Sequence, residues 1–156
     1  MSYWDWAIEV HGREGVDAAL NALQDEHGQC VAYLLWAAWA ARERRTLPPE
    51  ILMQGAALAK HWEGAATMPL RSARRHLKRP APPIPDQARE ALREQVRKAE
   101  FAAERLLMDT LESLAPQPEG GPRDLASDLI AAAHAWSRHV PEAELKALAA
   151  LVSPLP

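Results

Sequence analysis

The sequence predicts an all-α protein, a single-domain bundle of about seven helices. Alanine and leucine dominate its apolar residues and β-branched residues are few, a composition that favours helix over strand. Apolar residues also recur every three or four positions over most of the chain, which is the helical period. At 156 residues the chain is long enough to bury one core, so residues 1–156 are expected to form one domain.

Two short helices are expected at the start of the chain. Ser2 followed by Asp5 resembles a capping box with Asp in place of the usual Glu, which predicts a first helix at about 3–11. An apolar stripe follows, and Gly28 stands where a left-handed C-terminal cap is expected. The second helix is therefore expected at about 15–27.

The segment 31–41 is apolar on almost every side. A helix of this kind has to be surrounded by others, so the helix expected at about 30–44 is the central, buried one. It is too short to cross a bilayer, which takes about 20 residues. The pair Pro48 and Pro49 then marks the start of a fourth helix, in which Gly55 would let a neighbour approach closely.

A fifth helix is expected at about 69–79, where leucine and alanine form one edge and a stripe of basic residues lies beside it. It ends at residues 80–85, whose four prolines predict an extended, stiff spacer. The spacer divides the domain into an N-terminal helical part, residues 1–79, and a C-terminal part, residues 86–156.

A long helix is expected at about 86–114, followed by two shorter helices at about 123–138 and 142–152. Phe101 and Met108 form a small apolar strip on one side of the long helix, and the expected contact is one of the last two helices or another protomer. Whether the last two helices pack in cis or swap between protomers stays open. The core-facing seam expected on the opposite side consists of Ala88, Leu92, Val96, Ala99, Ala103, Leu106, Leu107, Thr110 and Leu114.

Positive charge is concentrated in the middle of an acidic chain. Residues 1–47 carry 4 basic and 7 acidic residues, residues 48–85 carry 6 and 2, and residues 86–156 carry 8 and 12. The simplest interpretation is a solvated helix face, partly paired with the acidic long helix. An acidic protein partner is the second, and nucleic acid or another anionic ligand is the third, because no aromatic residue lies between the cations for stacking. The cationic stripe consists of Arg71, Arg74, Arg75, Lys78 and Arg79.

The aromatic residues Tyr33, Trp36, Trp39 and Trp62 fit two interpretations. Their spacing is what a central helix needs to pack its neighbours, and filling of the core is favoured. The alternative is a Trp-lined pocket for an aromatic or acyl ligand, which would make the chain a small-molecule binder or an enzyme.

The stretch "DEHGQC" places His27 and Cys30 three residues apart, but the sequence shows neither an oxyanion hole nor a third orienting group. A metal held by His11, Asp25 and His27 is equally poorly supported, because the Glu-x-x-His pair of helical di-iron proteins is absent. No phosphate-binding loop or nucleophile elbow occurs. We therefore expect no catalytic residue, metal or cofactor.

Four stretches carry a family resemblance: "WDW" at 4–6, "LQDEHG" at 23–28, "VAYLLWAAW" at 31–39 and "PLRSARRHLK" at 69–78. They resemble a proteobacterial family of small conserved hypothetical proteins, domain of unknown function family 2390. The likeness covers residues 4 to about 114, and family members more often have Phe where Trp6 stands and Asp where Cys30 stands. The resemblance implies a helical fold and a bacterial cytoplasmic setting, and it assigns no activity.

Together these observations predict a non-enzymatic interaction or adapter protein that binds an acidic or helical protein partner through the cationic stripe. A second copy of the chain and nucleic acid are the alternative partners, and no membrane partner is expected. A single cysteine permits no internal disulfide, and no signal peptide is visible, so a cytoplasmic location is expected.

Overall fold

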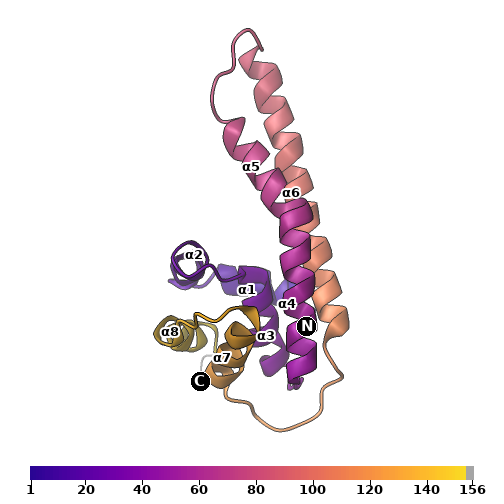
Figure 1. Ribbon diagram of the computed structural model, residues 1–156, viewed down its shortest axis with the longest axis vertical. Coiled ribbons are helices and arrows are strands. Elements are labelled where there is room, and N and C mark those ends of the chain that lie inside the picture. Colours follow the sequence, from indigo (N-terminus) through magenta and orange to yellow (C-terminus); the bar gives the residue numbers. More distant parts are fainter. Residues whose placement is uncertain (154–156) are drawn as a thin grey trace. The chain divides into compact units, whose positions relative to one another are not determined.

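The structure is a computed structural model, and it describes residues 1–153. A π-helical turn, η1 (Glu63–Thr67), joins two of the helices, so the described residues contain seven continuous helical segments and no strand. The all-α prediction is confirmed. The α-helices, labelled in Figure 1, are α1 (Tyr3–His11), α2 (Val16–Asp25), α3 (Val31–Arg42), α4 (Pro49–Trp62), α5 (Met68–His76), α6 (Asp86–Leu114), α7 (Leu125–Trp136) and α8 (Glu142–Val152).

The described chain divides into two compact units. Unit 1 comprises Met1–Ala59 and the described part of Met108–Pro156, and unit 2 comprises Lys60–Leu107. The division falls inside α4 and α6, whereas the proline spacer at residues 80–85 lies within unit 2.

Helix α3 is the centre of unit 1, as its all-round apolar sequence predicts. Every residue from Tyr33 to Ala41 is buried. The helix packs against α1, α2 and α7, and α8 packs in turn against α2 and α7. Burial on all sides makes α3 the helix around which the hydrophobic core of unit 1 is built.

Two local signals read from the sequence are present at the ends of α1 and α2. The Ser2 side chain accepts a hydrogen bond from the backbone N–H of Asp5 at 3.1 Å, which caps α1. Gly28 has φ of 63°, the left-handed conformation that only glycine adopts without strain, just after α2 ends at Asp25.

Gly55 is the place where α4 approaches α3. A Cβ atom at this position would lie 2.6 Å from Cζ3 of Trp36 and 3.3 Å from the ring of Tyr33. The Tyr33 hydroxyl donates a hydrogen bond to the carbonyl oxygen of Leu52, one turn earlier in α4, at 2.9 Å. The close approach predicted for Gly55 is thus present, and it brings α4 against the aromatic residues of the core.

Unit 2 is a helical hairpin in which the end of α4, η1 and α5 run in one direction and α6 returns (Figure 1). The Trp62 indole N–H donates to the carbonyl oxygen of Ala103 at 2.8 Å and ties the two arms together. Near the tip, the guanidinium of Arg89 donates to the carbonyl oxygen of Leu77, which is the C-cap of α5. Arg89 satisfies a carbonyl that the end of the helix leaves without an intrahelical partner.

The seam predicted for α6 is displaced from the observed one. Leu92 and Leu106, both expected in the core, have exposed fractions of 49% and 56%. The buried residues of α6 in unit 2 are Ala103 and Leu107, which the predicted seam included, and Arg89 and Glu100, which it did not. The prediction was wrong for Leu92 and Leu106, because it assumed that buried positions are apolar, whereas Arg89 and Glu100 carry charges that find partners inside the unit.

Candidate interaction surface of unit 2

Glu100 is the centre of an ion network between α5 and α6. Its side chain accepts from Nε of Arg71 at 3.1 Å and from Nε of Arg74 at 2.5 Å. Arg71 also pairs with Glu104 at 3.1 Å between Nη2 and Oε1. Glu100 is 7% exposed, and the two arginine side chains are 22% and 24% exposed. Arg71 and Arg74 are thus paired with the long helix, as the simplest interpretation of the stripe expects, and their guanidinium groups are engaged with internal carboxylates and not with a partner.

The network shifts the pKa values of its two carboxyl groups in opposite directions. Desolvation by burial would raise the pKa of Glu100, but hydrogen bonds from Arg74 and Arg71 outweigh it, and the pKa lies below its ordinary value. Burial raises the pKa of Glu104, because its single guanidinium partner offsets only part of the desolvation. Of the two carboxyl groups, Glu100 is therefore the one whose ionised form the network favours.

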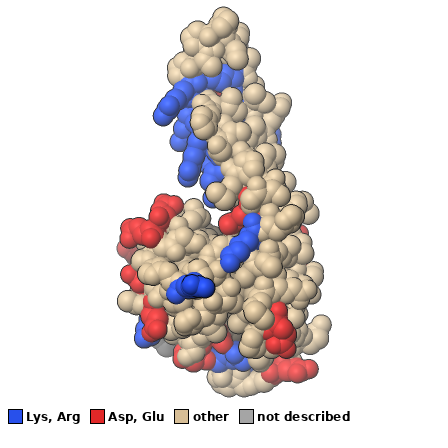
Figure 2. All heavy atoms as spheres, in the orientation of Figure 1, with Lys and Arg blue, Asp and Glu red and all other residues tan. Residues whose placement is uncertain are grey.

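The other three residues of the stripe, Arg75, Lys78 and Arg79, point to solvent. We call them the exposed cations. Within residues 1–153, no carboxylate oxygen forms an ion pair with any of the three. Figure 2 shows lysine and arginine side chains gathered along one edge of unit 2, with uncharged atoms over much of the rest of the visible face. The stripe is thus split into an inward pair and an outward group of three.

The two units differ strongly in formal charge. Unit 2 contains 11 Lys and Arg residues against 6 Asp and Glu, a net charge of +5. The rest of the chain contains 7 against 15, a net charge of −8, and the two values add to the −3 of the whole chain. The contrast is close to that of the sequence segments, +4 for residues 48–85 against −7 for the remainder, because residues 86–107 of α6 hold five basic and five acidic residues and add no net charge.

Phe101 and Met108 do not form one exposed strip. Phe101 is 53% exposed and belongs to unit 2, whereas Met108 is 8% exposed and belongs to unit 1. Their spacing of seven residues predicts a shared side of α6, but only Phe101 is exposed there. Met108 is buried and so is not accessible to a partner or a second protomer, and contact with a partner through Phe101 stays a prediction.

The aromatic residues of α3 fill the core. Tyr33, Trp36 and Trp39 are 0% to 1% exposed. The ring of Tyr33 lies 5.7 Å from that of Trp36 and 5.6 Å from that of Trp136, distances that are typical of packed aromatic pairs. Trp62 belongs to unit 2, where it is half-buried and hydrogen-bonded to Ala103. Core filling, the favoured interpretation of these residues, agrees with their burial, and the ligand pocket loses its support.

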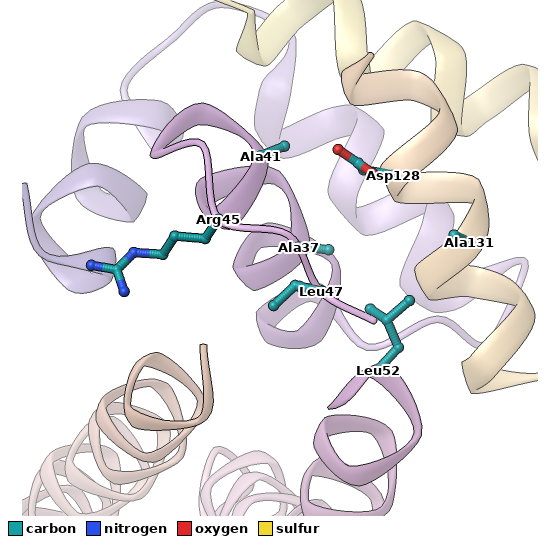
Figure 3. Close-up of a pocket in the computed structure, with 7 residues that line it drawn as sticks. All are labelled: Ala37, Ala41, Arg45, Leu47, Leu52, Asp128 and Ala131. Carbon is teal, nitrogen blue, oxygen red and sulfur yellow. The ribbon is translucent and has the colours of Figure 1, made fainter. Parts of the chain in front are cut away.

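A small hollow in unit 1 lies beside α3, and its lining residues are drawn in Figure 3. Its volume of about 20 Å³ has room for about one water molecule. The guanidinium of Arg45 points away from the hollow, as Figure 3 shows, and lies 5.1 Å from the ring centroid of Trp39. Asp128 is paired with Arg123 at 2.5 Å. The hollow is too small for a substrate, and both of its charged residues have partners. It is lined by Ala37, Ala41, Arg45, Leu47, Leu52, Asp128 and Ala131.

The histidines considered as metal ligands contact other side chains, and the cysteine considered as a nucleophile is buried. Nδ1 of His27 lies 3.0 Å from Nε2 of His139, and its Nε2 lies 3.5 Å from a carboxylate oxygen of Glu144. His11 pairs with Asp17 at 2.6 Å. Cys30 is 1% exposed. Over residues 1–153, no three His, Cys, Asp or Glu side chains are arranged to hold a metal ion.

Sequence reasoning missed two parts of this surface. Arg89 is 7% exposed and pairs with Asp86 and Glu90 in addition to its bond to the end of α5. Because Arg89 follows Asp86 by three residues, the sequence predicts an ion pair between them on one helix. No residue near Arg89 in the sequence predicts its hydrogen bond across the hairpin to Leu77. The role of Glu100 as the shared partner of two arginines 26 and 29 residues away likewise follows from the tertiary structure alone.

No helix within residues 1–153 combines the length and the apolar composition that a membrane span requires. Comparison with curated proteins and with solved structures gave no match. A family model matches residues 2–111, a range that contains α1 to α5 and nearly all of α6, and with them the whole ion network of unit 2. The chain therefore belongs to the family described as Protein of unknown function (DUF2390).

Proposed function

We propose that this chain is a cytoplasmic interaction protein that binds an acidic protein partner through the exposed cations of unit 2. The proposal rests on a difference among the five basic residues of the stripe: two form ion pairs inside unit 2 and three are exposed. Arg71 and Arg74 are paired with carboxylates of α6, whereas Arg75, Lys78 and Arg79 are exposed and form no ion pair within residues 1–153. Internal pairing thus accounts for the first two and leaves the other three for a partner.

The charge of unit 2 supports the same conclusion. A net charge of +5 on 48 residues creates a positive potential that attracts acidic surfaces and accelerates their association. Nucleic acid is the weaker candidate, because no aromatic side chain lies between the exposed cations to stack on bases. A location in the cytoplasm accords with the single cysteine, which is buried and so protected from oxidation.

The test is charge reversal of the exposed cations in the full-length chain. The triple variant Arg75→Glu, Lys78→Glu and Arg79→Glu is compared with wild type by quantitative affinity purification from the native host. Arg138→Glu, at an exposed position in unit 1, is the matched control. Circular dichroism of each purified variant verifies that the helices are retained.

We expect the triple variant to lose an acidic protein by more than tenfold, and the control to keep it. An unchanged set of partners would refute the proposal. Loss of the captured proteins after nuclease treatment of the wild-type sample would also refute it, because nucleic acid would then bridge them to the chain.

A further inference from the structure

An apolar strip lies exposed along α6 in unit 2. Leu92, Ala99 and Leu106 recur at intervals of seven residues, and all three are exposed, Leu92 by 49% and Leu106 by 56%. Three further exposed residues, at the complementary heptad positions, complete a pattern that is typical of a helix seam. We call the set the α6 strip: Ala88, Leu92, Gln95, Ala99, Ala102 and Leu106.

The strip is separate from the face of α6 that contacts α5. Glu100 and Ala103 lie near the middle of the contact face, since they bind Arg71, Arg74 and Trp62. At 100° per residue, Ala99 lies roughly a quarter-turn from this middle. Because the ion network places Glu100 on the face of α6 that contacts α5, the residues of the apolar repeat lie to one side of the contact between the two helices.

The apolar flank of α5 opens to the same side of the hairpin. Arg71 reaches Glu104, so the flank of α5 that carries Arg71 lies over the Glu104 side of α6. Leu70 and Leu77 lie on the other flank of α5, and the α6 strip lies on the other flank of α6. Both leucines are half-buried, as is Val96, which lies between the two flanks. Both helices thus present apolar side chains on the same side of the hairpin, and we call this side, between α5 and α6, the groove.

The length of the groove suits a helix. From Ala88 to Leu106 the strip spans about 27 Å at 1.5 Å per residue, or about five turns. Two antiparallel helices with apolar flanks on one side are completed by a third helix, which buries both flanks at once. The strip holds two leucines, three alanines and Gln95, and its alanines leave space for the larger side chains of an incoming helix.

Charge decides between the occupants. Two copies that met groove to groove would bring a unit of +5 against another of +5, so the groove is not complementary to itself. Lys98, which is exposed beside the strip, favours carboxylates on the flank of an incoming helix. We infer that the groove between α5 and α6 binds an amphipathic helix with acidic flanks that belongs to a partner protein. This inference rests on the proposed function and names the form of its acidic partner.

The first experiment locates the partner by photo-crosslinking with the full chain in the native host. A photoreactive amino acid replaces Ala99, in the strip, or Ser72, an exposed residue on the outer side of α5 that serves as the control. Mass spectrometry then identifies the crosslinked peptide. We expect the Ala99 site to crosslink, at least tenfold more than the Ser72 site, to a segment of another protein that has a helical apolar repeat and net negative charge.

The second experiment tests the charge of that segment with two variants of similar size. Gln95→Lys and Gln95→Glu are each combined with the photoreactive residue at position 99. Gln95 is exposed in the strip, and lysine and glutamate are both good helix formers, so neither variant disturbs α6. Glutamate is expected to lower the crosslink yield by more than tenfold, and lysine to preserve or raise it.

Four outcomes would overturn the inference: equal yields from the two Gln95 variants, a crosslink to a second copy, a crosslink within the same chain, or no crosslink at Ala99. The triple variant of the exposed cations shows whether the groove inference alone is wrong or the proposed function is wrong as well. If the triple variant loses its acidic partner while the strip variants keep it, the function stands and the groove is wrong. If none of the variants loses a partner, both are wrong.

Discussion

Gly55 offers a direct test of how tightly the core of unit 1 is packed. In the variant Gly55→Ala, the added Cβ would lie 2.6 Å from Cζ3 of Trp36 and 2.9 Å from Cη2, well inside ordinary van der Waals contact. Trp36 has little room to move, because it is completely buried and its ring packs against Tyr33. The strain must therefore be relieved by a shift of α4 away from α3.

The expected effect is a difference between two terms. Overpacking of a dense core costs roughly 1–3 kcal/mol, and replacing glycine by alanine inside a helix returns about 1 kcal/mol. The Tyr33 hydrogen bond to Leu52 is also strained if α4 moves, because Leu52 lies on that helix. We expect a net loss of about 1–2 kcal/mol in the free energy of unfolding, or about 3–6 °C in the melting temperature.

Urea denaturation followed by circular dichroism and tryptophan fluorescence measures the change. Gly64→Ala is the matched control, since a Cβ at position 64 meets nothing within 4 Å. The control is expected to be neutral or slightly stabilising, because it gains helix propensity without strain. If Gly55→Ala proves as stable as Gly64→Ala, the close packing of α4 on α3 is not as described.

Two further substitutions test the polar contacts. Glu100→Gln leaves Arg74 without its carboxylate, and we expect it to lower the free energy of unfolding by about 2–3 kcal/mol, more than Glu104→Gln does. The pKa of Glu100 is lowered in the folded state, so its ionised form stabilises the fold above the ordinary pKa of a glutamate, and this contribution is lost as the pH falls through the folded-state pKa. Unfolding measured between pH 7 and pH 3 should therefore show a shallower acid dependence in Glu100→Gln, and an unchanged slope would contradict the network. Tyr33→Phe leaves the carbonyl of Leu52 without its buried donor, and chemical denaturation should show a loss of about 1–2 kcal/mol; a neutral result would mean that water reaches this carbonyl.

The elements of unit 1 were predictable because their signals are local. The cap at Ser2, the glycine at position 28 and the apolar run of α3 each lie within a few residues of the structure they specify. The predicted bounds of 3–11 for α1 and of 142–152 for α8 coincide with the observed ones. Such features need no knowledge of distant residues, and the sequence alone therefore suffices for them.

The junction of α4 and α5 was predicted less well. The sequence favoured separate helices, with the second beginning near Pro69, but η1 makes the path continuous through Glu63–Thr67. Proline has no N–H to donate, and its ring clashes with the carbonyl four residues earlier in an ordinary α-helix. A wider π-turn immediately before Met68 relaxes this clash, so the helix continues where a break was expected.

The ion network was beyond the reach of periodicity. The sequence indicated that the stripe is partly paired with the acidic long helix, but not which arginines and which carboxylates take part. The partner of Arg71 and Arg74, Glu100, lies on another helix, and the pattern of either helix alone does not reveal it. The split of the cationic stripe into two inward and three outward residues therefore required the structure, and it changes the surface on which the proposed function depends.

The error in the α6 seam carries information of its own. In α3 the apolar pattern and the burial agree, and the chain itself covers the helix. In α6 the apolar repeat of Leu92, Ala99 and Leu106 has the heptad spacing of a coiled coil, yet these residues are exposed, while Arg89 and Glu100 share the inner face with Ala103 and Leu107. A regular apolar repeat costs solubility when it is exposed, and the partner helix that we propose would remove this cost by covering it. The apolar flank of α5 opens to the same side, which makes one shared groove a better explanation than two independent exceptions.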